Sequence, residues 1–136
     1  MLQDRLGYLL KHAQSALAAR TAAALEPLNI NGRELAVLSV LGAAEPLAQQ
    51  QAATRLSVDR TTMVDLVDTL ERKGMVERRS DPADRRRNLV HLTPEGEKTL
   101  AEGNRRTREI ERALLTDGEA DDLKRLLRRL LANAGS

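Results

Sequence analysis

Apolar residues recur at spacings of three and four along most of this 136-residue chain. In the first segment the recurring positions are Leu2, Leu6, Leu9, Leu10, Ala13 and Leu17. One face of an α-helix has this spacing, and no proline interrupts the pattern before Pro27. The pattern therefore predicts a helix over residues 2–26.

Capping signals delimit the next two predicted helices. In NINGRELAVLSVLG, residues 29–42, Asn31 suits an N-cap, Glu34 its capping-box partner, and Gly42 the end of the helix. After the connector AAEP, the segment LAQQQAATRL, residues 47–56, predicts a short third helix.

A fourth helix is predicted over SVDRTTMVDLVDTLERKG, residues 57–74. Asp59 or Ser57 would cap its start, an interaction that contributes about 1 kcal/mol, and Gly74 would stop it. The positions expected to face inward are Val64, Val67 and Leu70.

The hydrophobic period changes to two in MVERRS and NLVHLT, residues 75–80 and 88–93. The residues between them are rich in Asp, Pro and Arg, so the stretch predicts a two-stranded β-hairpin. Residues 93–115 and 118–134 then predict two more helices, with Thr93 as an N-cap and Pro94 at the first helical position. The fold class is mainly α with one small hairpin.

A short helix, a tight turn at LSV and a second helix form a helix-turn-helix layout. The second helix of such a unit can enter a DNA major groove, about 12 Å wide, with its N-terminal residues at the base edges. The exposed candidates for this role are Arg60, Thr61 and Thr62, while Asp59 is expected to cap. Many helical proteins contain the same corner, so the order of helices alone does not decide the function.

Positive charge is concentrated beside this unit. The net charge is +2, and residues 55–87 hold nine basic against seven acidic side chains. A hairpin after a recognition helix is a wing, whose tip can reach a minor groove about 6 Å wide, where negative potential attracts arginine. Arg85, Arg86 and Arg87 are predicted to do this at the tip. The predicted phosphate contacts are Arg55, Arg78 and Arg79. The alternative is a solvated charged loop.

The segment LSVDRTTMVDLVDTLERKGMVERRSDPADRRRNLVHLTPEG, residues 56–96, resembles the MarR (multiple-antibiotic-resistance regulator) family of winged helix-turn-helix transcription factors. The positions that carry the resemblance are Asp84, Arg86, Val90, Leu92, Thr93 and Gly96. The resemblance implies a homodimer on a pseudo-palindromic operator, with Arg86 in the minor groove and Asp84 as its support. It also implies a small aromatic or phenolic effector that binds between the dimerisation and DNA-binding lobes and weakens DNA affinity, which favours a repressor.

Two departures from the family pattern bear on mechanism. Asp65 and Thr69 stand where such recognition helices often have basic residues, so fewer phosphate contacts are expected from this helix. The chain has no cysteine, which excludes disulfides, thiolate metal sites and the cysteine-based redox sensing of some relatives.

Apolar stripes outside the winged unit predict a dimer. The first stripe recurs at Leu100, Gly103, Thr107, Ile110 and Leu114, and the second at Leu123, Leu126, Leu127, Leu130 and Leu131. A single chain would leave much of these stripes exposed, and large exposed apolar patches usually mark an interface. The alternative is that the stripes pack within one chain.

The expected organisation is one MarR-like domain over residues 1–136. Its winged DNA-binding lobe covers residues 27–93, and residues 1–26 and 94–136 form the dimerisation helices. Tyr8, His12 and Arg33 are the candidates for the effector pocket, although Tyr8 could instead fill a dimer core. His12 and His91 are the only histidines, and their separation gives poor support for a metal site.

Other function classes find little support in the sequence. No nucleophile elbow, phosphate loop, dinucleotide fingerprint or metal-ligand cluster is present, so neither an enzyme nor a cofactor is expected. No apolar run approaches the roughly 18–20 residues of a membrane span, and no signal peptide is evident, so a cytoplasmic location is expected. The rival hypothesis is a helical interaction module that binds a protein instead of DNA.

Overall fold

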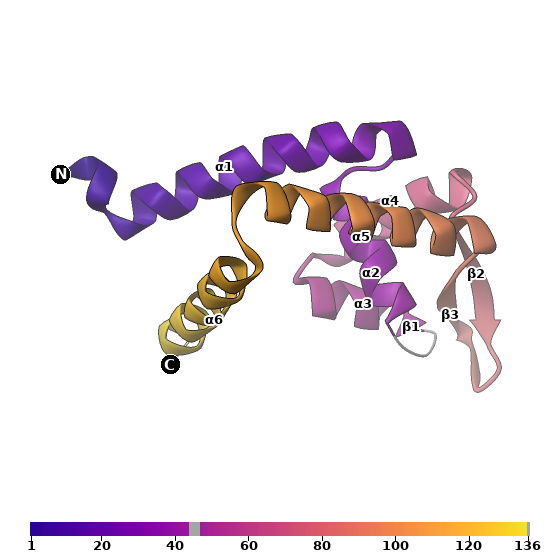
Figure 1. Ribbon diagram of the computed structural model, residues 1–136. Coiled ribbons are helices and arrows are strands. Elements are labelled where there is room, and N and C mark those ends of the chain that lie inside the picture. The colour runs from indigo at the N-terminus through magenta and orange to yellow at the C-terminus, as the bar shows by residue number, and fades with distance from the viewer. Residues whose placement is uncertain (44–46, 136) are drawn as a thin grey trace.

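Long helices carry a small winged unit at one end of the molecule in the computed structural model, which describes residues 1–43 and 47–135 (Figure 1). The elements in chain order are η1 (Leu2–Asp4), α1 (Leu6–Leu25), η2 (Glu26–Leu28), α2 (Gly32–Gly42), β1 (Leu47–Ala48), α3 (Gln49–Leu56), α4 (Arg60–Arg72), β2 (Val76–Asp81), β3 (Asp84–Leu92), α5 (Pro94–Leu114) and α6 (Asp117–Ala134). The fold class predicted from the sequence, mainly helical with a β wing, is confirmed.

The predicted first helix is divided into three pieces. Arg5 is extended, with φ −74° and ψ 133°, so η1 precedes α1 as a separate turn. At the other end, Pro27 lacks the N–H that a continuing α-helix requires, and the chain forms η2 instead. Asn29 then ends this turn in the left-handed conformation, with φ 59°.

Side-chain caps begin the helices where the sequence indicated them. The Asn31 side chain accepts a hydrogen bond from the Glu34 N–H at 2.9 Å, and Glu34 Oε1 accepts one from the Asn31 N–H at 3.0 Å. Asp59 is the cap of α4, because its Oδ1 accepts from the Thr62 N–H at 2.7 Å. Ser57 is instead the residue that ends α3, with φ 55°.

Within the described residues the sheet has three strands in the order β1-β3-β2, all antiparallel, where the sequence predicted two. Leu47 and Ala48, predicted to open the third helix, pair with Val90 and Leu89 of β3. Both residues are buried, and extended backbone there places Ala48 as the residue before α3. Burial of the pair against the hairpin therefore outweighs two more residues of helix.

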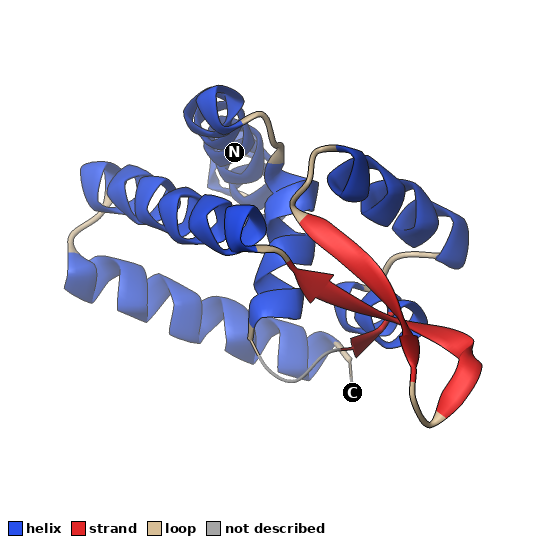
Figure 2. Cartoon of the chain, turned by 90° about the vertical axis from the view of Figure 1, so that its right-hand side faces the viewer, coloured by secondary structure: helices blue, strands red, loops and turns tan. Residues whose placement is uncertain are grey.

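The hairpin is longer than the alternation suggested. β2 and β3 together span residues 76–92, and the turn is confined to Pro82 and Ala83 between them. The Asp81 carboxylate supports this turn by accepting a hydrogen bond from the Ala83 N–H at 2.9 Å. Arg85, Arg86 and Arg87 consequently belong to strand β3, one to three residues after its start, and not to the turn itself. Figure 2 shows the hairpin projecting from the helices.

The buried core lies beneath the winged unit. The largest fully buried side chains are Leu25, Val37, Leu38, Met63, Val67, Leu70, Val76 and Val90. They come from the end of α1 and from α2, α4, β2 and β3. The predicted inward positions Val67 and Leu70 are buried, while Val64 is only half-buried. The core thus fixes α4 against the wing and against α2.

A compact joint connects α4, the wing and α5. The Thr93 hydroxyl donates to the Gly74 carbonyl at 2.6 Å and accepts from the Gly96 N–H at 3.1 Å, so it also caps α5. Gly74 has φ +76°, a left-handed conformation that glycine adopts readily. A Cβ on Gly96 would lie 1.9 Å from the Met75 carbonyl oxygen, so only glycine permits this approach.

A buried ion pair ties α2 to the end of α4. The Lys73 ammonium lies 2.9 Å from Glu34 Oε2 and donates to the Asn29 carbonyl at 2.7 Å. Glu34 is 3% exposed, and its other oxygen is engaged in the cap of α2. The start of α2 and the end of α4 therefore hold each other in place.

Candidate DNA-binding surface

Helix α4 has one buried and one solvent-facing side. Met63, Val67 and Leu70 point into the core. Because successive residues turn by 100°, the opposite side carries the four residues that we call the exposed ridge of α4. The exposed ridge consists of Thr61, Asp65 and Arg72, which are exposed, and Asp68, which is half-buried.

The three predicted base-reading residues lie in different environments. Thr61 is exposed on the ridge, and Arg60 is exposed on the flank of α4. Thr62 is half-buried, and its hydroxyl donates to Asp59 Oδ2 at 3.0 Å. Thr62 is therefore only partly exposed, because the residue completes the cap of its own helix, and its contact with base edges stays a prediction.

The wing carries exposed arginines on β3. The Arg86 side chain is 93% exposed, and Asp84 Oδ1 lies 3.4 Å from its Nε and 3.1 Å from its backbone nitrogen. Arg85 and Arg87 are exposed and have no hydrogen bond or ion pair within the described residues. Asp84 thus lies where the resemblance implied it, beside Arg86.

Arg78 lies at the base of the wing and is engaged within the protein. Its guanidinium lies 2.7 Å from Asp68 Oδ1 and 2.9 Å from Glu71 Oε1, both on α4. Nε also donates to Gln49 Oε1 of α3 at 3.2 Å, and the side chain is only 19% exposed. A phosphate contact, as predicted for Arg78, would have to displace these partners. Through these contacts Arg78 instead links the wing to α3 and α4.

The other two predicted phosphate contacts are more accessible. Arg79 is 62% exposed and pairs with Glu77 of its own strand. Arg55 is exposed in the last turn of α3 and has no partner within the part of the chain that the structure describes. Both guanidinium groups remain within reach of an approaching polyanion.

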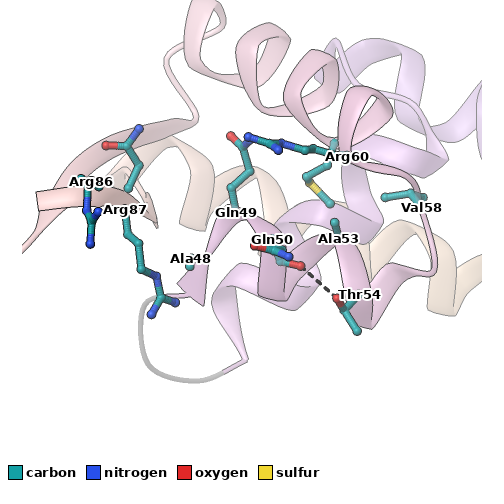
Figure 3. A pocket seen from close by; sticks show the side chains of 11 residues that line it. Ala48, Gln49, Gln50, Ala53, Thr54, Val58, Arg60, Arg86 and Arg87 are labelled. Atoms are coloured by element: carbon teal, nitrogen blue, oxygen red, sulfur yellow. Dashed lines mark hydrogen bonds between the residues drawn. The ribbon is translucent and has the colours of Figure 1, made fainter. Parts of the chain in front are cut away.

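A hollow of about 410 Å³ separates α4 from the wing. Figure 3 shows Arg60 on the α4 side and Arg86 and Arg87 on the wing side, with Gln49 and Gln50 of α3 between them. Polar and cationic side chains from α3, α4 and β3 therefore converge on one face of the molecule. Such a face suits an anionic partner with hydrogen-bonding groups.

The three candidates for the effector pocket do not meet within one chain. Tyr8 and His12 contact each other, with ring centroids 4.1 Å apart, near the start of α1. Arg33 lies in the first turn of α2, which follows the C-terminal end of α1 through η2. His12 precedes Leu25, at that end of α1, by thirteen residues, or about 20 Å of helix. Helix α1 therefore holds Tyr8 and His12 away from Arg33 within one chain, and a pocket formed by all three residues stays a prediction.

Large apolar side chains are exposed at the end remote from the wing. They are Met1, Leu2, Leu6, Leu9, Leu17, Leu114, Leu123, Leu126 and Leu131. Helix α6 has no buried residue, and both termini lie at this end (Figure 1). The second predicted stripe is thus largely uncovered, whereas Gly103 in the first stripe packs against Leu35 and Leu25.

Hydrogen bonds lower the pKa values of the carboxylates Asp59, Glu102 and Glu119, the last of which belongs to the cap of α6. Hydrogen bonds from the Thr62 N–H and hydroxyl lower the pKa of Asp59. Hydrogen bonds from Arg105, and then Arg106, lower the pKa of Glu102 to about 2. Arg106 also donates to the Ala24 carbonyl at 3.1 Å, which joins α5 to the last turn of α1. These carboxylates therefore stabilise local structure and are ionised at neutral pH.

Within the described residues, no group of three or more His, Cys, Asp or Glu side chains is placed to bind a metal ion. Over the same residues, no helix combines the length and the apolarity that crossing a bilayer requires. His12 and His91 are on separate elements, α1 and β3.

Known proteins similar to this chain identify its family. The MarR family model matches residues 28–87. A Thauera aromatica protein named for regulation of the hcr operon is 36% identical over 97 residues, which are 69% of this chain and 58% of that protein. MarR of Salmonella typhimurium is 32% identical over 111 residues, which are 79% of this chain and 77% of MarR. The chain belongs to the MarR family of transcriptional regulators.

Solved structures of MarR-like regulators share the whole fold. The transcriptional repressor CouR bound to a 23-mer DNA duplex has a TM-score of 0.84 and 30% identity, covering 99% of this chain and 95% of CouR. CouR of Rhodococcus jostii RHA1 bound to p-coumaroyl-CoA has a TM-score of 0.83 and 30% identity, covering 96% and 92%. The predicted family and the predicted class of transcriptional regulator are confirmed.

Sequence reasoning missed the partners of Arg78 in this MarR-family chain. Period-two alternation contained a usable signal, because Arg78 shares a strand face with Val76, which is buried. Arg79 points to the opposite, solvent-facing side. An inward arginine requires carboxylates nearby, and Asp68 and Glu71 are the acidic residues that α4 offers at that side.

Proposed function

We propose that this MarR-family regulator binds a pseudo-palindromic operator as a homodimer and represses transcription until a small effector binds. The observation that carries the proposal is the pairing of two groove-reading elements on one face. Arg60 of α4 and Arg86 and Arg87 of β3 line one hollow, and Arg78 links the two elements. In this arrangement α4 enters a major groove while the wing reaches the adjacent minor groove.

The exposed side chains suggest a division of roles. Arg60 and Thr61 would meet base edges in the major groove, with Thr62 restricted to its capping role. Arg86 would enter the minor groove, held in an extended pose by Asp84. The proposed phosphate contacts are Arg55, Arg79, Arg85 and Arg87.

Homodimerisation is proposed from the exposed leucines of η1, α1, α5 and α6. Water contact with so many large apolar side chains is unfavourable by roughly 25 cal/mol per Å² of apolar surface. A two-fold axis through these helices would cover the apolar surface of both protomers with one self-complementary interface. It would also set two α4 helices about 34 Å apart, one turn of DNA. We therefore propose the same boundaries as the sequence suggested: residues 27–93 form the DNA-binding lobe, and residues 1–26 and 94–136 form the dimerisation helices.

A small aromatic or phenolic effector is proposed by analogy with CouR, whose structures contain either a DNA duplex or p-coumaroyl-CoA. Tyr8, His12 and Arg33 could contribute to one pocket only if the second protomer brings them together. We further propose that the protein acts in the cytoplasm, where chromosomal DNA is accessible, and that it regulates by binding and not by catalysis.

The test is a selection of bound duplexes from a random pool at near-physiological salt. We expect an inverted repeat with half-site centres one helical turn apart. Titrations of the selected duplex should give log affinity that falls linearly with log salt, by about 0.9 for each phosphate neutralised. Failure to bind any duplex even in dilute buffer would favour the rival protein-interaction module.

A further inference from the structure

Asp65 is an unpaired carboxylate at the centre of the exposed ridge of α4. It lies one helical turn beyond Thr61, on the side opposite Met63 and Val67. No hydrogen bond or ion pair involves its side chain within residues 1–43 and 47–135. Asp68, one turn further along the ridge, differs because Arg78 lies 2.7 Å from it.

The folded chain gives Asp65 no evident stabilising role. Basic residues on α4 lie at positions 60 and 72, five residues before and seven after, which misses the favourable spacings of three and four. Arg72 donates to Thr69 Oγ1 at 3.1 Å instead. The position is also too far from the start of α4 for the helix dipole to favour a negative charge. Aspartate is a poor residue for a helix interior, so its use here calls for a partner outside the chain.

A carboxylate in a major groove is repelled by almost everything it meets. The phosphates that line the groove are anionic, and the N7 and O6 of guanine and the O4 of thymine are acceptors. An ionised carboxylate only accepts hydrogen bonds, so it requires a donor. Adenine N6 donates, but the N7 acceptor beside it opposes a carboxylate. Cytosine offers its N4 amino group next to a C5–H, which makes it the favourable partner.

We propose that Asp65 is a specificity-determining residue that accepts a hydrogen bond from the N4 amino group of a cytosine in each operator half-site. Through charge repulsion it also weakens binding to duplexes that lack cytosine at that position. This inference rests on the proposed function, because it assumes that α4 enters the major groove. Asp68 is paired with Arg78, so its charge is already compensated. Asp65 is the other carboxylate of the exposed ridge, and no arginine pairs with it within the described residues.

The experiment compares the wild-type protein with Asp65→Ala and Asp65→Asn. Each protein selects duplexes from one random pool, and dissociation constants are measured for the selected operator, for operators with single base changes and for an unrelated duplex. For the wild type, replacing one cytosine per half-site should weaken binding about tenfold or more. The same replacement should weaken binding of Asp65→Ala less than about twofold, and this variant should bind the unrelated duplex roughly two- to fivefold more tightly.

Asp65→Asn provides a readout that a purely structural role would not produce. An amide both donates and accepts and can pair with adenine N6 and N7, so the preferred base at this position should shift from cytosine to adenine. The matched control is Asp121→Ala on α6, which is also exposed and unpaired within the described residues and removes the same charge. This control should change neither the base preference nor the affinity for the unrelated duplex.

Several results would overturn the inference. One is a cytosine preference that Asp65→Ala retains at every position, and another is weaker binding of that variant to the unrelated duplex. Equal effects of Asp121→Ala would assign the change to net charge and not to position. The proposed function is tested by a different result, because it requires only that the wild-type protein select an inverted repeat.

Discussion

The two ends of the molecule expose different kinds of side chain to solvent. The reading end, residues 47–92, buries its apolar side chains in the core and keeps unpaired arginines on its surface. The helical end, residues 1–24 and 107–134, exposes large leucines and has no buried residue in α6. Unpaired guanidinium groups suit a polyanion, whereas uncovered leucines suit another apolar surface. Each end therefore indicates its own kind of partner.

The largest effect is expected from a charge placed in the helical end. Leu126→Glu should split the dimer, because moving a carboxylate from water into an apolar interface is unfavourable. Loss of the second half-site should weaken operator binding by about 10²- to 10⁴-fold. Sedimentation and operator titration measure the two effects. Arg128→Glu on the same helix tests whether any added negative charge is enough, and a dimeric Leu126→Glu protein would contradict the assigned interface.

The next largest effect is expected at the distal part of the wing. Arg86→Ala should weaken binding to every duplex by roughly tenfold, because a cation that neutralises DNA charge is lost from each protomer. The slope of log affinity against log salt should become shallower by about 0.9 per protomer. Arg108→Ala on α5 removes the same charge away from the reading end and should leave the slope unchanged. An unchanged slope for Arg86→Ala would remove Arg86 from the interface.

A smaller effect is expected at the base of the wing. A substitution of Arg78 tests whether this residue links the wing to α4 or contacts DNA. Arg78→Met should weaken operator binding by severalfold, because Asp68 and Glu71 lose the guanidinium that joins them to β2. The salt slope should stay at the wild-type value, since no phosphate contact is lost. Arg79→Met, one residue along and facing solvent, should instead lower the slope. A lower slope for Arg78→Met would show that Arg78 does contact phosphate.

The smallest effect is expected at the cap of α4. Asp59 has a lowered pKa because the Thr62 N–H and hydroxyl donate to its ionised form. The cap therefore contributes stability at pH values above the ordinary pKa of the group, and this contribution is lost as the pH falls through the lowered value. Asp59→Ala should lower the melting temperature by a few degrees at pH 7. Melting curves recorded from pH 7 to pH 2 should converge for the two proteins, and a gap that persists in acid would contradict the capping role.

Local signals predicted much of the winged lobe, residues 27–93. The capping box of Asn31 and Glu34, the cap at Asp59 and the period-two strands each depend on residues close in sequence, so their outcome follows from local chemistry. The two-residue strand Leu47–Ala48 was not predictable in this way, because its partners in β3 are about forty residues distant. Two residues are too few to show a hydrophobic period, so this segment has no strand signal of its own.

Long-range geometry limited the predictions about individual side chains. Arg78 was grouped with the exposed arginines because charge was counted along the chain, whereas strand alternation turns it toward α4. Tyr8 and Arg33 were grouped by family resemblance, and the length of α1 separates them within one chain. The exposed leucines of α6 were predicted correctly, because an amphipathic stripe is local even when its partner is a different molecule.

The central claim is that two copies of this chain bind one duplex, each with a helix in the major groove and a wing in the minor groove. The mass of the complex on the selected operator tests it most directly, by native mass spectrometry or sedimentation. Two 15.0 kDa chains should be found on each duplex, at all protein concentrations that give binding. A complex with a single chain per duplex, or a free protein with no complex at low salt, would contradict the claim.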